Sequence, residues 1–149
     1  MPHHRREILL GALSLPLLPF ALPVSVQEKS QKKMDAPTPD FRRFALEGLQ
    51  AQRTTSAKAW LQFFAVPSMR CGLYVLPKGG VDAQTPHEED EIYHVLAGRA
   101  LFRVKASDGE IDQAVEPGDV LFVKRHVEHR FHDIAEDLQL LVVFSSATA

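Results

Sequence analysis

The residues of this chain with the clearest chemical potential lie between Gly80 and Gly98, in the stretch GVDAQTPHEEDEIYHVLAG. It contains His87 and, four residues later, Glu91. Turn-prone residues come first and strand formers follow, which predicts a loop leading into a strand. On one fully extended strand the two side chains would lie about 13 Å apart, at roughly 3.3 Å per residue. We therefore expect His87 on the bend before the strand and Glu91 as the first inward-facing residue of the strand.

A second stretch, from Pro117 to Asp133, supplies a further histidine. A Pro-Gly-Asp turn leads into a short strand, and His129 stands at the start of the next one. Together with His87 and Glu91 it makes a set of two histidines and one carboxylate. Such a set suits a divalent transition metal and leaves coordination positions open for water or substrate. The sequence does not choose among Fe, Mn, Ni and Zn.

The first stretch resembles the first motif of the cupin family. That motif reads His, any residue, His, three or four residues, Glu, six residues, Gly, and His87, Glu91 and Gly98 have this spacing. The motif's first histidine falls at Thr85, so the family's usual set of three histidines and one glutamate is reduced to three ligands. The neighbouring Gln84, or a water molecule held by Thr85, is left open as a substitute.

The second stretch is similar to the second cupin motif, which reads Gly, five residues, Pro, any residue, Gly, two residues, His. Gly118 and His129 match its ends, whereas Lys124 and His126 replace the internal proline and glycine. The resemblance covers roughly residues 73–144. It implies a double-stranded β-helix of jelly-roll type with the site inside the barrel, and a homodimer.

Alternation along the expected strands sorts the neighbours of the three ligands. Tyr93 is in phase with Glu91 and Phe131 with His129, so both are expected to line the pocket with Gln84 and Thr85, although plain core packing suits them equally. Other ionisable residues are expected to stay outside the site. His94 and His132 are out of phase, His126 reaches the site only if its loop folds inward, and Glu88, Glu89 and Asp90 are expected to face water.

The composition is that of an ordinary globular domain. The chain has 149 residues, 45% of them hydrophobic and 24% charged, which predicts one domain with a real core. A net charge of −2 gives no electrostatic case for nucleic acid, which needs a basic face, so we expect no nucleic-acid partner. The candidate metal site and the cupin resemblance instead imply a small-molecule ligand or substrate. The single cysteine, Cys71, excludes a disulfide within the chain and a cysteine-cluster zinc site.

The first 33 residues differ from the rest. Histidines and arginines precede an uncharged run of nineteen residues from Ile8 to Val26, as in an export signal or a membrane anchor. In that case the protein is periplasmic or membrane-anchored. Alternatively, Met34 is the natural start, residues 1–33 are an over-long start, and the protein is cytoplasmic.

Residues 34–57 are expected to form a linker and one short helix. Asp40 resembles an N-cap, and Phe41, Phe44, Ala45 and Leu49 recur at helical spacing. Residues 58–146 then predict an all-β barrel, because short strand patterns alternate with turn signals and crossover helices are lacking. The expected strands cover residues 59–65, 69–76, 91–96, 99–105, 111–115, 120–123, 128–132 and 138–144.

Two functional hypotheses follow from these expectations. The first is a mononuclear metal enzyme, a dioxygenase or an isomerase, that acts on a small metabolite. The second is a non-catalytic small-molecule-binding or structural cupin, and a metal ion held only for stability is a third reading. The cupin resemblance implies members of both main kinds, so it does not choose the reaction.

Overall fold

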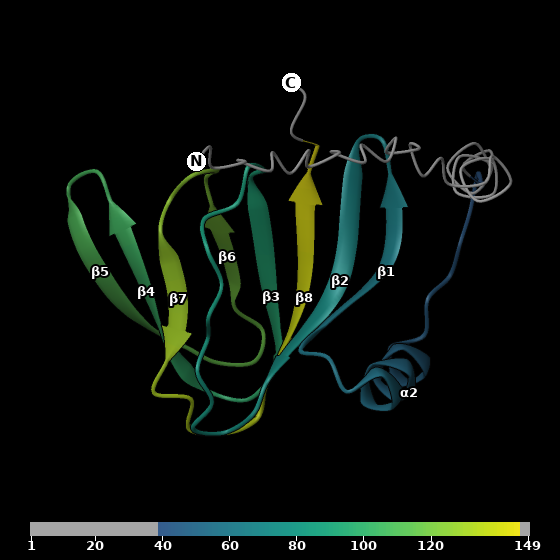
Figure 1. The fold of residues 1–149 in the computed structure, drawn as a ribbon, viewed down its shortest axis with the longest axis horizontal. Coiled ribbons are helices and arrows are strands. Elements are labelled where there is room, and N and C mark those ends of the chain that lie inside the picture. The colour runs from purple at the N-terminus through teal and green to yellow at the C-terminus, as the bar shows by residue number, and fades with distance from the viewer. Residues whose placement is uncertain (1–38, 147–149) are drawn as a thin grey trace, which may run out of the picture. The chain divides into compact units, whose positions relative to one another are not determined.

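Eight strands and one helix make up the part of the chain that the computed structural model describes, residues 39–146 (Figure 1). The order of the elements agrees with the sequence pattern, because the strands end where the glycine, proline and aspartate turns were expected. The elements are α2 (Leu46–Ser56), β1 (Trp60–Val66), β2 (Met69–Leu76), β3 (Glu91–Ala97), β4 (Ala100–Ala106), β5 (Gly109–Val115), β6 (Val120–Val123), β7 (His129–His132) and β8 (Leu138–Ser145).

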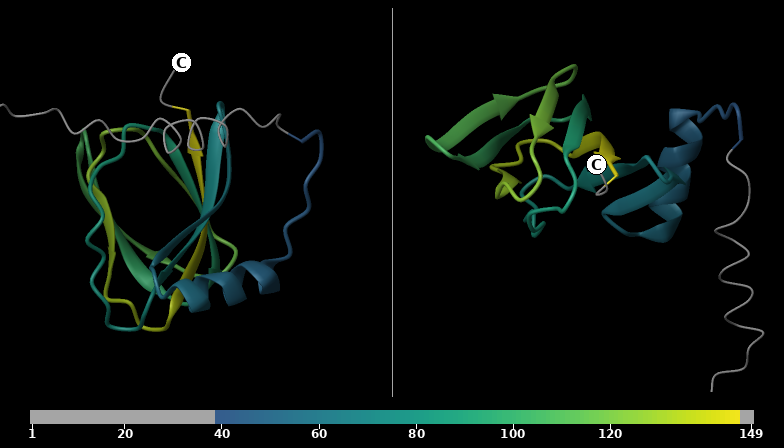
Figure 2. Two further views of the ribbon diagram at one scale, coloured as in Figure 1. Left: turned by 45° about the vertical axis from the view of Figure 1, so that its right-hand side comes forward. Right: turned by 90° about the horizontal axis from the view of Figure 1, so that it is seen from above.

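The strands form two antiparallel sheets. The larger has the order β1-β2-β8-β3-β6 and the smaller has the order β5-β4-β7. Figure 2 shows the two sheets facing each other across the interior of the barrel. Several neighbouring strands are distant in the sequence, as β2 and β8 are, and this is the jelly-roll arrangement. The predicted all-β fold class is confirmed.

The core lies between the two sheets and follows the period of two along each strand. On β8 every second residue is buried, from Leu138 to Phe144. The smaller sheet contributes Phe102 and Phe131, whose ring centroids are 4.6 Å apart. The inner face of β3 differs from the rest of the core in carrying a charged group. Its first residue, Glu91, is a buried carboxylate on the same face as buried apolar side chains.

Two turns carry backbone conformations that matter for the site. Gly98 has a φ of +86°, and a Cβ there would collide with the backbone of Asp137 and Leu138, so this position requires glycine. His126, which replaces the internal glycine of the second motif, has a φ of +64°. The structure thus shows why a glycine suits that position and that the histidine adopts the same left-handed conformation.

The helix begins later than the sequence pattern predicted, so the prediction of Asp40 as its N-cap is wrong. Helix α2 starts at Leu46, and Ala45 at the N-cap makes no side-chain capping bond. Phe41, expected on the apolar stripe of the helix, is 82% exposed. Leu49 is the buried residue of α2, which packs on β1 and β2 outside the barrel.

Tertiary packing explains the late start. Phe44 lies before the helix, and its ring contacts those of Phe63 and Phe64 on β1, at centroid distances of 4.8 and 5.8 Å. These aromatic contacts hold Phe44 in a non-helical segment against the strand. The helical spacing of Phe41, Phe44 and Leu49 therefore misled the prediction.

Several predictions lie beyond what the structure describes. The export or anchoring segment, the alternative start at Met34 and the resulting localisation all involve residues outside the described range. Within residues 39–146 no helix has both the length and the apolar character needed to cross a membrane. The homodimer stays a prediction.

Candidate metal centre

The loop before β3 and the loop between β6 and β7 meet at one end of the barrel. The backbone N–H of His126 donates to the carbonyl oxygen of His87 at 2.8 Å, which joins the two motif stretches directly. Glu91 opens β3 and pairs with Phe144 of β8 on one side and with Val123 of β6 on the other. The bend therefore carries His87, and a central strand carries Glu91.

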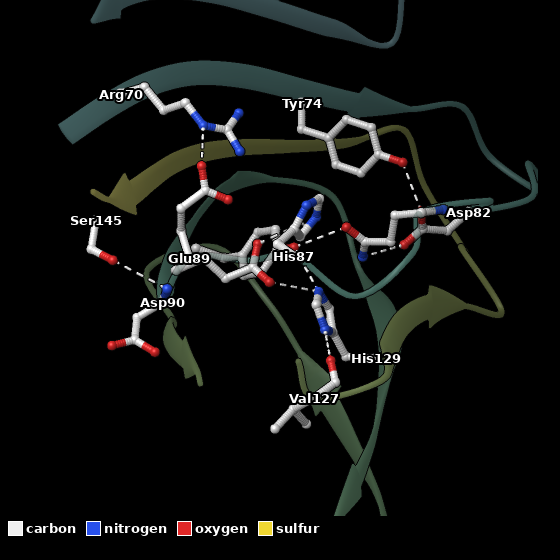
Figure 3. A network of polar contacts seen from close by, with 12 residues as sticks. Arg70, Tyr74, Asp82, His87, Glu89, Asp90, Val127, His129 and Ser145 are labelled. Atoms are coloured by element: carbon white, nitrogen blue, oxygen red, sulfur yellow. Dashed lines mark hydrogen bonds and ion pairs between the residues drawn. The ribbon is translucent and has the colours of Figure 1, made fainter. Parts of the chain in front are cut away.

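His87 and His129, which lie far apart in the chain, approach each other here (Figure 3). Glu91 joins them to make one cluster of three possible ligands. Glu91 Oε1 lies 2.9 Å from His129 Nε2, and Glu91 Oε2 lies 3.8 Å from His87 Nε2. One potential ligand atom from each residue lies within 4.8 Å of the others. Atoms that each bond one ion at about 2.1 Å lie up to roughly 4.2 Å apart, so both pair distances suit shared coordination. His87, Glu91 and His129 thus form a candidate metal site.

The carboxylate of Glu91 is incompletely satisfied. Glu91 is 2% exposed, and its Oε2 has no hydrogen-bond partner. A buried polar atom without a partner typically costs about 1–3 kcal/mol, and more when it is charged. A cation between Oε2 and the His87 ring would remove this cost, so the residues present fit a metal ion.

The hydrogen bond on the far side of His129 orients its ring. Nδ1 lies 2.7 Å from the carbonyl oxygen of Val127, which only accepts, so Nδ1 carries the hydrogen. Nε2 then faces Glu91 and needs either a proton or a metal ion between them. Burial of the ring lowers the pKa of His129, but hydrogen bonds to Glu91 and Val127 outweigh it, and the pKa lies above its usual value.

Asp82 is a buried carboxylate that the sequence analysis did not single out. It is 7% exposed and accepts from Tyr74 Oη at 2.7 Å, from Gln84 Nε2 at 2.8 Å and from the Phe131 N–H at 2.8 Å. Asp82 therefore ties the loop before β3 to both sheets. No motif marks it in the sequence, because its role appears only when these partners are brought together.

The structure separates the two residues considered for the vacant ligand position. Thr85 is exposed and does not line the pocket, whereas Gln84 is half-buried beside the site. The Oε1 atom of Gln84 accepts from the Tyr93 hydroxyl at 2.9 Å, and that hydroxyl lies 3.0 Å from His129 Nε2. Phe131 packs in the core, with its ring centroid 5.4 Å from that of Tyr93, and not in the pocket wall.

A cavity of about 190 Å³ opens beside the candidate metal site, and His87 is the candidate ligand that lines it. Two of its walls come from Trp60 and Tyr74, which the sequence analysis assigned only to strands. Aromatic content in the first strand was the one available signal for Trp60. The cavity is lined by Trp60, Tyr74, Gln84, His87, Tyr93, Val142 and Phe144.

The acidic residues between His87 and Glu91 lie outside the site, but only Glu88 is fully exposed to water as expected. Glu89 pairs with Arg70 at 3.1 Å, and Asp90 accepts from the backbone N–H of Arg125 at 2.9 Å. The expectation that Glu89 and Asp90 simply face water is therefore wrong. Their contacts hold the loop on the barrel.

The remaining histidines near the motifs also lie away from the cavity. His94 is half-buried on the opposite face of β3 from Glu91, as the strand alternation predicted. His126 is exposed, with its Nε2 3.8 Å from Glu88 Oε2. His132 Nε2 lies 2.8 Å from Asp112 Oδ1 on the smaller sheet.

The fold and the site define a small barrel with a candidate metal centre, and comparison with known proteins agrees. The profile described as "Cupin domain" matches residues 72–144. The chain belongs to the cupin family. An uncharacterised protein of Streptomyces coelicolor is 43% identical over 105 residues, which cover 70% of this chain and 96% of the relative. Acireductone dioxygenase of Bacillus cytotoxicus is 31% identical over 58 residues, or 38% of this chain and 34% of that enzyme.

Solved structures support the fold. A Thermus thermophilus protein aligns with a TM-score of 0.54 and 21% identity, over 71% of this chain and 98% of that one. KdgF from a Halomonas species aligns with a TM-score of 0.51 and 20% identity, over 58% of this chain and 76% of that one. At these identities the likeness shows the jelly-roll architecture alone.

Proposed function

We propose that this protein binds one divalent transition-metal ion through His87, Glu91 and His129 and acts on a small molecule in the adjoining cavity. The unpartnered Oε2 of Glu91 carries the proposal, because a 2% exposed carboxylate oxygen beside two imidazoles is placed for a cation. The hydrogen bond from His129 Nδ1 to Val127 supports it, since histidine ligands commonly donate their other N–H to a carbonyl.

Each side chain has a distinct part in this proposal. Glu91 supplies the negative charge, and His87 and His129 supply neutral nitrogen ligands. When bound, an ion with open coordination positions would supply Lewis-acid chemistry or, in the case of iron, redox chemistry. Val142 and Phe144 give the cavity apolar walls that limit water near the site.

The reaction class that we propose is that of a dioxygenase or an isomerase. Three protein ligands leave room for a substrate, which both classes require. The partial similarity to acireductone dioxygenase supports the dioxygenase reading, although this chain spans only about a third of that enzyme.

A non-catalytic ligand-binding cupin is the second candidate, and two observations favour it. The position of the motif's first histidine is taken by Thr85, which is exposed. In addition, burial raises the pKa of Tyr93 far above its usual value, and the nearby Glu91 raises it further, so the hydroxyl keeps its proton at neutral pH and supplies no phenolate base. In this reading the cavity binds a small molecule without chemistry.

Elemental analysis of protein purified without a histidine tag tests the metal proposal. We expect about one equivalent of Fe, Mn, Ni or Zn, as for a mononuclear site. His129→Gln should lower the metal content at least about tenfold, since even outer-shell changes cost 10- to 100-fold in affinity. His94→Gln is the matched control, because His94 lies on the other face of β3, and it should keep the metal.

Undiminished metal in His129→Gln would show that the ion binds elsewhere.

The two candidate functions are then separated with chelated protein. A ligand that raises the melting temperature equally with and without metal supports the binding protein. A ligand that binds only the metal-loaded protein supports the enzyme.

A further inference from the structure

The cavity beside the candidate metal centre has the walls of a site for a flat apolar ring. Trp60 and Phe144 meet edge to face with centroids 5.7 Å apart, and Tyr74 and Val142 complete the apolar surface. Trp60 can take this place because its ring lies over Gly72, where any Cβ would collide with the indole. An apolar cavity of about 150 Å³ accommodates benzene, so about 190 Å³ has room for one substituted ring.

The polar end of the cavity has a defined hydrogen-bond direction, which begins at Asp82. The carboxylate of Asp82 only accepts, so the atom of Gln84 that faces it at 2.8 Å is the amide nitrogen. The amide oxygen of Gln84 therefore faces Tyr93. Because that oxygen also only accepts, the Tyr93 hydroxyl donates its hydrogen to Gln84.

The Tyr93 oxygen consequently presents its lone pairs toward the metal-ligand side of the cavity. It lies 3.0 Å from His129 Nε2, beside the buried carboxylate of Glu91. Both oxygens are acceptors there. A ligand group that contacts the Tyr93 oxygen must therefore donate a hydrogen bond, since an acceptor there would face lone pairs without a hydrogen between them.

The side chains that line the cavity in the described part of the chain offer no positive charge to an anionic ligand. No lysine or arginine is among the side chains that line it in the described part of the chain. Arg70 is near, but its guanidinium stacks on the Phe144 ring at 3.7 Å from the centroid and pairs with Glu89. A carboxylate or phosphate would therefore lack a free cationic side chain in the cavity wall.

We propose that this cavity takes a planar, single-ring compound that carries at least one hydroxyl group, with the ring against Trp60 and Phe144 and the hydroxyl donating to the Tyr93 oxygen. This inference rests on the proposed function, because it names the substrate class of the same site. It excludes sugars and other non-planar polyols as the preferred ligands, since their rings do not offer a flat apolar face.

Trp60 provides the measurement, because it is the only tryptophan of the chain and lines the cavity. Full-length protein is loaded with Co²⁺, whose visible absorption reports coordination, and is titrated with catechol and with trans-cyclohexane-1,2-diol while Trp60 emission is recorded. Both probes carry two adjacent hydroxyls, and only catechol is flat. We expect catechol to bind at least about tenfold more tightly, since stacking on an aromatic side chain contributes on the order of a tenfold gain.

Tyr93→Phe tests the hydroxyl contact. It removes the acceptor but keeps the ring, and Tyr93 is not one of the three candidate ligands. We expect Co²⁺ absorption to persist and catechol affinity to fall about fivefold or more, which corresponds to the loss of one hydrogen bond. His94→Gln, on the outer face of β3, serves as the control and should leave both the Co²⁺ absorption and the catechol affinity unchanged.

The outcomes separate the two proposals. Failure to bind Co²⁺ would overturn the metal proposal, and the same titrations on metal-free protein would still test the ligand class. Normal Co²⁺ binding with equal affinities for the two diols would overturn the ligand class alone. Tighter binding of tetramethylammonium than of catechol would also overturn it, because the aromatic walls would then serve a cation. Unaltered catechol affinity in Tyr93→Phe would show that the ligand hydroxyl does not bind the Tyr93 oxygen.

Discussion

Asp82 is the residue that holds the loop before β3 in place, although it is not a candidate metal ligand. Its carboxylate accepts from the backbone of Phe131, from the side chain of Gln84 and from the hydroxyl of Tyr74. These partners belong to both sheets and to the loop before β3. The hydrogen bond that Tyr93 donates to the amide oxygen of Gln84 takes its direction from this one acceptor.

Asp82→Asn should therefore destabilise the protein. The amide would turn an NH₂ group toward a donor, and a lost hydrogen bond to a charged group costs about 1.5–3 kcal/mol. Urea denaturation followed by circular dichroism measures the free energy of unfolding. Asp108→Asn, in the exposed turn before β5, is the control and should change it by less than about 0.5 kcal/mol. Equal stability of the two variants would contradict the role assigned to Asp82.

At the scale of elements, turns with special backbone conformations set the ends of the strands. Gly98 follows β3 with a φ of +86° and has no space for a Cβ. His126, between β6 and β7, has a φ of +64° and donates its backbone N–H to His87. The turn after β3 has the glycine that the first cupin motif requires. The turn between β6 and β7 has His126 in place of the internal glycine of the second motif.

Substitutions at these two turns should have opposite effects. His126→Gly should stabilise the protein by about 0.5–1 kcal/mol, because it removes left-handed strain from an exposed side chain while keeping the N–H. Gly98→Ala should destabilise it by more than about 2 kcal/mol through strain and collision with the backbone. Thermal unfolding measures both. A destabilised His126→Gly would mean that the imidazole contributes more than its exposed position indicates.

The smaller sheet carries an exposed polar network that makes one carboxyl unusually acidic. Hydrogen bonds from Arg103 and then from His132 lower the pKa of Asp112 to about 2. Since the pKa is lower in the folded than in the unfolded protein, its contribution to stability is present above the ordinary pKa near 4 and is lost as the pH falls toward 2. The carboxyl ¹³C shift of Asp112 should therefore titrate near pH 2.

Arg103→Gln should raise the pKa of Asp112 toward its ordinary value, because the guanidinium that stabilises the carboxylate most is removed. The same NMR titration measures this change. The hydrogen bond from His132 remains in the variant, so the pKa of Asp112 should stay somewhat below its ordinary value. A pKa that stays near 2 without Arg103 would mean that His132 alone holds the carboxyl ionised.

At the scale of the whole molecule, the candidate ligands join the loop before β3, a central strand of the larger sheet and the first residue of β7 in the smaller one. An ion bound by all three would link the two sheets at one end of the barrel. Metal binding and folding should then be coupled, because the unfolded chain does not hold the three ligands together.

Chelation should lower the melting temperature of metal-loaded protein. At a thousandfold excess of metal over its dissociation constant, binding adds about 4 kcal/mol to the stability. EDTA should remove this contribution from the wild type and from His94→Gln but should leave His129→Gln unchanged. Differential scanning calorimetry measures the shift. If EDTA lowered the melting temperature of both variants equally, the stabilising ion would be bound at a different site.

The sequence by itself determined the strands, because alternation of apolar residues and turn-forming Gly, Pro and Asp are local signals that the barrel reinforces. Motif spacing also singled out His87, Glu91 and His129, which the fold brings together. Tertiary structure alone decided that Gln84 and not Thr85 borders the site, that Asp82 organises it, and that Trp60 and Tyr74 wall the cavity. It also determined that the helix begins only at Leu46, because the ring of Phe44 packs on aromatic side chains of β1. These outcomes depend on contacts between residues far apart in the chain, and neither local propensity nor spacing encodes such contacts.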